Sequence, residues 1–310
     1  MKFPKLKIGD LIPKYPIIQG GMAIKISMAK LAAAVANEGG IGVIAGTALS
    51  VDELKKEIKK AKEMTKGIIG VNIMYAATDF VEGVKASIEA GIDLIIYGAG
   101  FSRDVFEIGK EANVPIVPIV SSLKLAKIAE KLGAAAIVVE GANAGGHLGT
   151  DKDSWEIVKE IKESVKIPVI GAGGVVTPED VKRMLDLGLD GVQMGTRFLA
   201  SEECEIADSY KELLVKSGSA DVITIESSAG LPANAISTPF SRSVMAGNPT
   251  PVTHCNNCLK HCNRKFCVND ALRKGHAGDM ENGLFFTGRD LDKIKEIMSV
   301  KEIFKEIVEY

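Results

Sequence analysis

Short apolar runs alternate with amphipathic stretches from residue 16 to about residue 217 of the chain. The runs are rich in Val, Ile, Ala and Gly with few polar interruptions, a pattern typical of strands that are buried on both faces of a parallel sheet. Eight such runs are predicted as strands: Pro16–Met22, Ile41–Gly46, Ile68–Tyr75, Leu94–Gly100, Val114–Ser121, Ala135–Gly141, Ile167–Gly174 and Gly191–Phe198.

The segments between these strands have the periodicity of amphipathic helices, for example at residues 51–66, 122–133 and 178–188. In the second of these, Leu125, Ile128 and Leu132 recur at intervals of three and four residues, which places one apolar stripe against a sheet. The sequence Thr-Pro-Glu-Asp at 177–180 combines a capping hydroxyl, a first-turn proline and two carboxylates. It therefore predicts the start of a helix.

Eight strand–helix units in about 200 residues predict a closed TIM (β/α)8 barrel. An open doubly wound sheet is the rival architecture, but it usually has fewer units. We expect the barrel to occupy residues 1–217. Residues 218–310 are expected to form a smaller segment on the substrate side, with a cysteine cluster and C-terminal helices that pack on the barrel.

Composition narrows the function classes. The 310 residues include 38 basic and 40 acidic side chains, a formal net charge of −2, which argues against nonspecific nucleic-acid binding. No apolar run approaches the roughly 20 residues of a membrane-spanning helix, and the N-terminus lacks the apolar stretch of a secretory signal. We therefore expect a soluble, cytoplasmic protein with no nucleic-acid or membrane partner.

Glycines at the strand ends suggest a bound cofactor. In a barrel the carboxyl ends of the strands form the catalytic face, and the loops after the last two strands usually bind phosphate. Here these loops contain Gly-Ala-Gly-Gly at 171–174 and Gln-Met-Gly-Thr at 193–196, so a phosphorylated cofactor is expected. The loop after the sixth strand presents His147 between small residues, where an imidazole can act as a base or a hydrogen-bond donor.

Five segments together resemble the nitronate monooxygenase (2-nitropropane dioxygenase) family, which includes the flavin-dependent enoyl-acyl-carrier-protein reductase of the second type. They are Gln-Gly-Gly-Met at 19–22, Gly-Val-Asn-Ile at 70–73, Ala-Gly-Gly-His at 144–147, and the two glycine-containing segments at 171–174 and 193–196. They follow the family's order and spacing over residues 10–240. The resemblance implies an FMN-binding barrel.

By position, the resemblance also implies roles for individual residues. His147 matches the active-site histidine of the family. The residues implied to contact FMN, through its ring or its phosphate, are Gly21, Met22, Asn72, Glu140, Gly145, Gly173, Gly174, Gln193, Met194, Gly195 and Thr196.

The resemblance leaves the substrate open between two branches. The leading expectation is oxidation of alkyl nitronates by O2, and the alternative is reduction of an enoyl thioester, carried by acyl carrier protein, with NADH as the electron donor. The pair Glu140–Gly141 is closer to the reductase branch, whereas Gly230–Ile236 only partly follows either branch. Outside redox chemistry, a phosphate-binding isomerase or synthase would share the glycine-rich strand ends.

Cysteines cluster near the C-terminus. Cys255, Cys258, Cys262 and Cys267 have C-x2-C-x3-C-x4-C spacing, which suits an iron–sulfur cluster or a zinc ion, although four reduced thiols are an equal alternative to the cluster. The remaining tail, Asp290–Tyr310, has the periodicity of one or two amphipathic helices that pack on the barrel. A homodimer contact through this tail is also compatible with the pattern.

Overall fold

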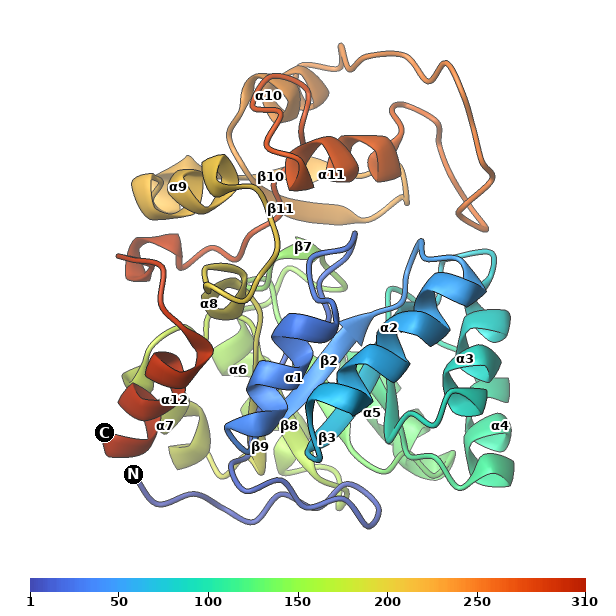
Figure 1. Ribbon diagram of the computed structural model, residues 1–310, viewed down its shortest axis with the longest axis vertical. Helices are drawn as coiled ribbons and strands as arrows, with labels where there is room; N and C mark the ends of the chain where they lie inside the picture. Colours follow the sequence, from blue (N-terminus) through green and yellow to red (C-terminus); the bar gives the residue numbers. More distant parts are fainter.

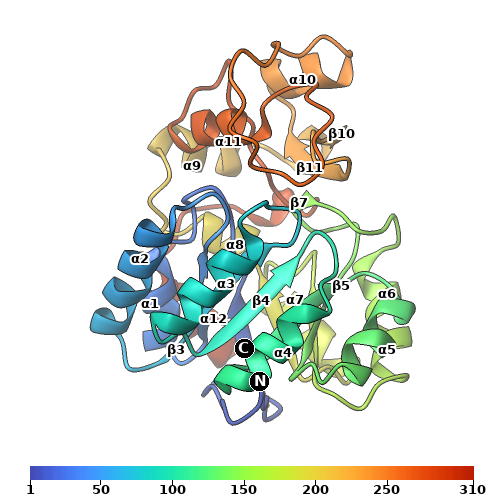
Figure 2. The ribbon, with the colours of Figure 1, turned by 90° about the vertical axis from the view of Figure 1, so that its right-hand side faces the viewer.

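Eight parallel strands close into a barrel in the computed structural model, which describes residues 1–310 (Figures 1 and 2). Each strand pairs with its neighbours in chain order, and β9 closes the ring by pairing with β1. The barrel strands are β1 (Ile17–Gln19), β2 (Ile41–Ala45), β3 (Ile68–Met74), β4 (Leu94–Gly98), β5 (Ile116–Val120), β6 (Ile137–Glu140), β8 (Val169–Ala172) and β9 (Gly191–Met194). The predicted TIM barrel is confirmed.

Helices follow the strands and cover the outside of the barrel (Figure 2). The predicted helix start at Thr177 is confirmed, because the Thr177 side chain accepts from the Asp180 N–H and the Asp180 carboxylate accepts from the Thr177 N–H. The helices of the barrel are α1 (Ala29–Asn37), α2 (Val51–Met64), α3 (Phe80–Glu89), α4 (Asp104–Ala112), α5 (Leu123–Lys131), α6 (Ser154–Lys162), α7 (Pro178–Asp186) and α8 (Thr196–Leu199).

The strands end earlier than the sequence pattern predicts. Residues Gly173 and Gly174, expected in a strand, have φ of +90° and +77°, a conformation that leaves the sheet and turns the chain toward the barrel mouth. The last predicted strand, Gly191–Phe198, is also too long, because β9 ends at Met194 and residues Thr196–Leu199 form α8. Apolar periodicity alone does not separate a short strand from a buried helical turn.

A cap covers the carboxyl ends of the barrel strands. It comprises α9 (Asp208–Lys216), the 3-10 helix η1 (Ser219–Asp221), β10 (Val222–Glu226), β11 (Pro232–Ile236), α10 (Pro239–Met245) and α11 (Val268–His276). Figures 1 and 2 both place these elements above the barrel. The short strand β7 (Gly146–His147), from the connection between β6 and β8, pairs with β11, so one small sheet joins the cap to the barrel.

After the cap, the chain returns to the barrel through the 3-10 helix η2 (Leu291–Lys293) and α12 (Val300–Glu309). Ile303, Phe304 and Ile307 of α12 are buried, and α12 contacts α1 and α7. Figure 1 shows both chain termini at the end of the barrel away from the cap. The tail residues that recur at helical spacing therefore pack on the barrel, and the segment between cap and tail crosses the barrel mouth.

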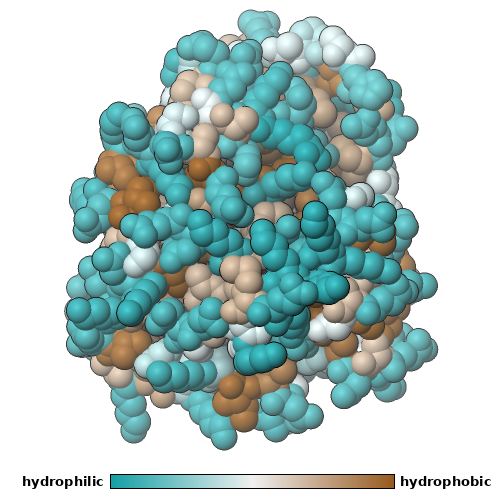
Figure 3. All heavy atoms as spheres, in the orientation of Figure 1, coloured by the Kyte–Doolittle hydropathy of each residue, from teal (hydrophilic) through white to brown (hydrophobic).

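Apolar packing divides the barrel into two regions. Ile18, Val43, Ile96, Val117 and Ile170 fill its interior below the mouth, and a larger cluster lies between the strands and the surrounding helices. The face drawn in Figure 3 is mostly hydrophilic, with hydrophobic residues in small separate groups. None of the helices has the length and apolar character needed to cross a membrane.

Candidate active site

A cavity of about 240 Å³ lies between the carboxyl ends of the barrel strands and the underside of the cap. We call it the mouth cavity. One wall is formed by α11 and by Phe286, Thr287, Gly288 and Asp290, and the floor is formed by the loops that follow the strands. The cavity brings together most of the residues predicted from the sequence: Gly21, Met22, Asn72, Glu140, Gly145, His147, Gly173, Gly174, Gln193, Gly195 and Thr196.

Met194 is the exception among the predicted cofactor contacts. Its side chain is fully buried in the core between the strands and the helices and does not line the cavity. Its carbonyl oxygen accepts from the Gly20 N–H at 2.8 Å, which holds the β1 loop against β9. The side chains of a strand alternate between its two faces, so Gln193 faces the mouth and Met194 faces the helices.

A close approach explains the glycine at position 21. A Cβ atom placed there would lie 2.3 Å from Cβ of Asn72, well inside van der Waals contact. The loop after β1 can therefore lie against β3 only if residue 21 has no side chain. This contact positions Gly21 and Asn72 side by side on the cavity wall.

His147 lies on β7, between the barrel and the cap. Its backbone pairs with Ala233 of β11, its Nε2 lies 2.8 Å from Oγ of Ser227, and its ring meets Phe286 edge-on with centroids 5.3 Å apart. Burial lowers the pKa of His147 to about 4, so the imidazole is neutral at pH 7.

Ser227 bears on the tautomer of this histidine. Its Oγ accepts from the Ala229 N–H at 3.3 Å and lies 2.8 Å from Nε2 of His147, which is the acceptor available for the hydroxyl proton. If Nε2 accepts this proton, the neutral ring carries its own proton on Nδ1 and can donate a hydrogen bond from there.

Glu140 ends β6 opposite Ala172 and lines the same cavity. Burial raises the pKa of its carboxyl to about 7. Near neutral pH this side chain therefore exchanges a proton readily, which is the property expected of an acid–base group.

The raised pKa of Glu140 predicts a change in stability with pH. Between pH 4.5, the ordinary pKa of a glutamate, and about pH 7, the folded apoprotein retains a proton that the unfolded chain releases, so this carboxyl contributes less stability as pH rises. In Glu140→Gln the contribution disappears. The free energy of unfolding of the variant minus that of wild type should therefore rise by up to about 3 kcal/mol from pH 4.5 to pH 8. Denaturant titration at each pH measures this difference. Glu107→Gln, at an exposed position, is the control; parallel pH curves for wild type and Glu140→Gln would contradict the prediction.

The ionisable side chains around the cavity include acidic groups but no cationic ones. Glu140, Asp290 and the neutral His147 are its ionisable side chains, and no Lys or Arg lines it. An anionic substrate group placed beside Glu140 and His147 would meet no basic side chain. This part of the cavity therefore suits a neutral reacting group.

Unpartnered polar atoms test whether a cofactor fits. Five buried side-chain N or O atoms of the protein have no hydrogen-bond partner, and three of these belong to residues that line the cavity: Oε1 of Gln193, Oγ1 of Thr287 and Oδ2 of Asp290. Buried polar groups are normally paired, so their concentration here indicates a polar ligand. Gln193 Oε1 and Asp290 Oδ2 are acceptors and Thr287 Oγ1 is a hydroxyl, so a cofactor that carries hydroxyl or N–H donors fits this set.

Sequence reasoning missed the part of the site that comes from the cap and the tail. Val268 and Leu272 of α11, together with Phe286, Thr287 and Asp290, line the cavity but lie more than 70 residues beyond the last barrel strand. One signal was available: Thr287 and Gly288 follow the apolar run 284–286, as the glycines follow the barrel strands.

The cysteine segment docks on the loop after β3 rather than on the cavity. The Cys258 carbonyl accepts from the Thr78 N–H at 3.2 Å, and Lys260 Nζ lies 3.7 Å from the ring centroid of Tyr75. Cys255 and Cys262 are exposed. No group of three or more His, Cys, Asp or Glu side chains is arranged to hold a metal ion. The structure gives the expected iron–sulfur or zinc site no support, and we derive no function from it.

Comparison with known proteins gives a family and a fold. The nitronate monooxygenase family model matches residues 5–310. The solved structure of FabK from Thermotoga maritima is 32% identical in sequence, with a TM-score of 0.85 over 96% of this chain and 92% of that one.

Two curated relatives extend the comparison. A probable nitronate monooxygenase from Staphylococcus saprophyticus is 27% identical over 77% of this chain and 80% of the relative. An octahydro-indene-carboxyl-CoA dehydrogenase from Rhodococcus jostii is 29% identical over 231 residues. That match covers 74% of this chain but only 65% of the dehydrogenase, so a third of the dehydrogenase has no counterpart in it.

Proposed function

Because this chain belongs to the nitronate monooxygenase family, we propose that it is an FMN-dependent oxidoreductase with its active site in the mouth cavity. Bound FMN would supply hydride transfer between two substrates that react in turn. The residues that would hold it are the predicted FMN contacts that line the cavity, among them Gln193, whose amide oxygen has no partner.

We propose an enoyl thioester as the oxidising substrate and NADH as the electron donor. The observation that carries this choice is the absence of Lys and Arg from the cavity, because a thioester carbonyl is neutral whereas a nitronate is an anion. FabK from Thermotoga maritima, 32% identical over nearly the whole chain, supports the reductase branch. The Rhodococcus relative, named for a carboxyl-CoA substrate, also supports a thioester.

In this proposal two side chains serve the reacting thioester. The Nδ1–H of His147, fixed by the hydrogen bond of Nε2 with Ser227, donates to the carbonyl oxygen and stabilises the charge that develops there. The Glu140 carboxyl supplies a proton to the α-carbon when a hydride reaches the β-carbon. Val268 and Leu272 of α11 cover this region and exclude water from it.

Oxidation of alkyl nitronates by O2 is the second candidate. The Staphylococcus relative named as a probable nitronate monooxygenase favours it, and it was the leading expectation from the sequence. A neutral His147 is also compatible with it, because the nitronate is already deprotonated and needs no base.

Anaerobic mixing tests the choice between the two. The FMN-loaded protein should lose its flavin absorbance on addition of NADH and recover it on addition of crotonyl thioester, with one thioester reduced per NADH consumed. Loss of absorbance with propyl nitronate and not with NADH would instead support the monooxygenase. A flavin that responds to neither would contradict both candidates.

A further inference from the structure

The segment 286–290 lies across the loops that form the cofactor end of the mouth cavity. The Gly288 N–H donates to Oγ1 of Thr196 at 3.0 Å, and the Arg289 N–H donates to the Asn143 carbonyl at 3.1 Å. A Cβ atom at Gly145 would lie 2.8 Å from the carbonyl carbon of Thr287. Gly145, predicted as a cofactor contact, thus also allows this segment to approach the barrel.

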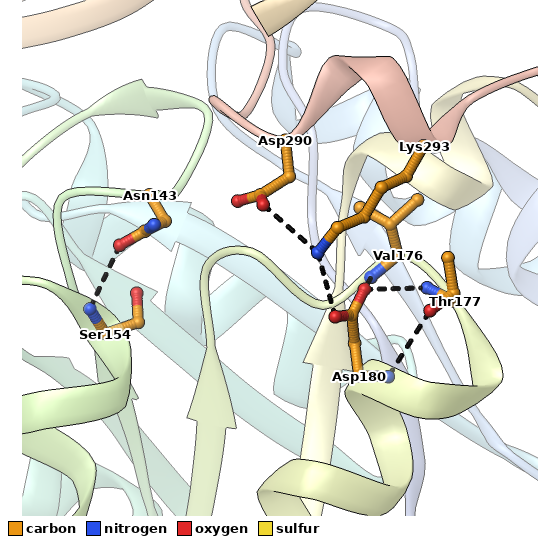
Figure 4. Close-up of polar contacts among 7 residues, drawn as sticks. All are labelled: Asn143, Ser154, Val176, Thr177, Asp180, Asp290 and Lys293. Carbon is orange, nitrogen blue, oxygen red and sulfur yellow. Dashed lines mark hydrogen bonds and ion pairs between the residues drawn. The ribbon is translucent and has the colours of Figure 1, made fainter.

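Asp290 ends the segment and has one oxygen in use and one free. Its Oδ1 pairs with Nζ of Lys293 at 3.1 Å, and Nζ also pairs with Asp180 at 2.8 Å (Figure 4). The other oxygen, Oδ2, is buried without a partner, and a Cβ atom at Gly174 would lie 2.9 Å from it. The carboxylate is therefore anchored through Oδ1 and has an unused acceptor at the cavity.

Thr287 provides a second unused group in the same segment. It lines the cavity, the residue is 1% exposed, and its Oγ1 has no hydrogen-bond partner. A buried hydroxyl without a partner costs free energy that a ligand can recover.

We propose that Asp290 and Thr287 form a hydrogen-bonding site for the hydroxyl groups of the ribityl chain of the flavin. The proposal rests on the proposed FMN cofactor and goes beyond the contacts that the family resemblance implies. A carboxylate accepts well from hydroxyl donors but repels a phosphate dianion, and the cation beside it is already shared with Asp180. The ribityl hydroxyls are the donors of FMN that match Oδ2 of Asp290.

Binding of three flavins to the apoprotein tests this assignment. FMN, riboflavin and lumiflavin share the ring, riboflavin lacks the phosphate, and lumiflavin lacks both the phosphate and the ribityl hydroxyls. For Asp290→Ala we expect the dissociation constants of FMN and riboflavin to rise by a similar factor, about tenfold to a hundredfold, with that of lumiflavin unchanged. Lys293 keeps its bond to Asp180 in this variant, so no buried cation is left unpaired.

Thr287→Val and Asp292→Ala complete the experiment. The valine variant should bind FMN several-fold more weakly while the apoprotein melts at the same or a higher temperature, since the lost hydroxyl had no partner. Asp292 is exposed, lies on η2 two residues after Asp290 and does not line the cavity, so its variant should bind all three flavins normally.

Three other results would contradict the proposal, and each would contradict a different part of it. Equal weakening of lumiflavin by Asp290→Ala would mean that Asp290 only maintains the fold. Unchanged riboflavin binding, or tighter FMN binding, would place the phosphate and not the ribityl chain beside Asp290. Failure of the wild-type apoprotein to bind FMN would refute the proposed function itself.

Discussion

Replacing His147 with alanine is expected to lower kcat by about 10²- to 10⁴-fold while FMN still binds. The imidazole is held between Ser227 and Phe286, and His147 is the only histidine that lines the mouth cavity. Alanine leaves the substrate carbonyl without this donor, so the loss should appear in kcat more than in KM. Steady-state kinetics on FMN-loaded protein, with the bound flavin quantified, measure this effect.

His276→Ala is the matched control, because His276 is partly buried in the cap but does not line the cavity. Its kcat should stay within about twofold of wild type. The kcat of Ser227→Ala should lie between those of His147→Ala and His276→Ala, because the imidazole remains but loses its hydrogen bond with Ser227. Full activity of His147→Ala with every substrate that wild type turns over would remove this residue from the mechanism.

Gly195→Val is expected to weaken FMN binding by more than about 100-fold without weakening the fold. Residue 195 has φ of −103°, which a side chain accepts, and the one atom near a Cβ placed there is Sδ of Met22 at 3.9 Å. The new side chain would therefore occupy open space in the cavity, where the cofactor is proposed to lie. Fluorescence titration with FMN and thermal melting of the apoprotein measure the two effects separately.

Gly188→Ala is the control that should change stability and leave FMN binding unchanged. Gly188 has φ of +84° with no atom within 4 Å of an added Cβ, and it lies outside the cavity. Its substitution should cost about 1 kcal/mol of stability through backbone strain and leave FMN affinity unchanged. If Gly195→Val binds FMN as tightly as wild type, the cofactor does not occupy that part of the cavity.

The barrel could be predicted from the sequence because its signals are local. The strand at Ile41–Ala45 and the helix start at Thr177 are each encoded within a few residues, by apolar runs and by a capping box. The glycines at 173 and 174 marked the barrel mouth because their positive φ ends a strand. Eleven of the twelve predicted catalytic and cofactor residues therefore line one cavity.

The rest of the site depends on contacts between distant segments, which leave no periodic signal. Asp290 meets Gly174 across more than 100 residues of sequence, and the bond of Ser227 to His147 depends on the pairing of β11 with β7. The Met194 side chain lies in the core and not in the cavity, and a motif match does not show which way a strand side chain points.

The absorption spectrum and cofactor content of the purified protein test the central claim, that the mouth cavity binds FMN. We expect the visible absorption of oxidised flavin and, after denaturation, release of one FMN per chain, with chain lacking FMN taking it up on titration to the same ratio. A colourless protein that takes up no FMN at any concentration tested would contradict this account.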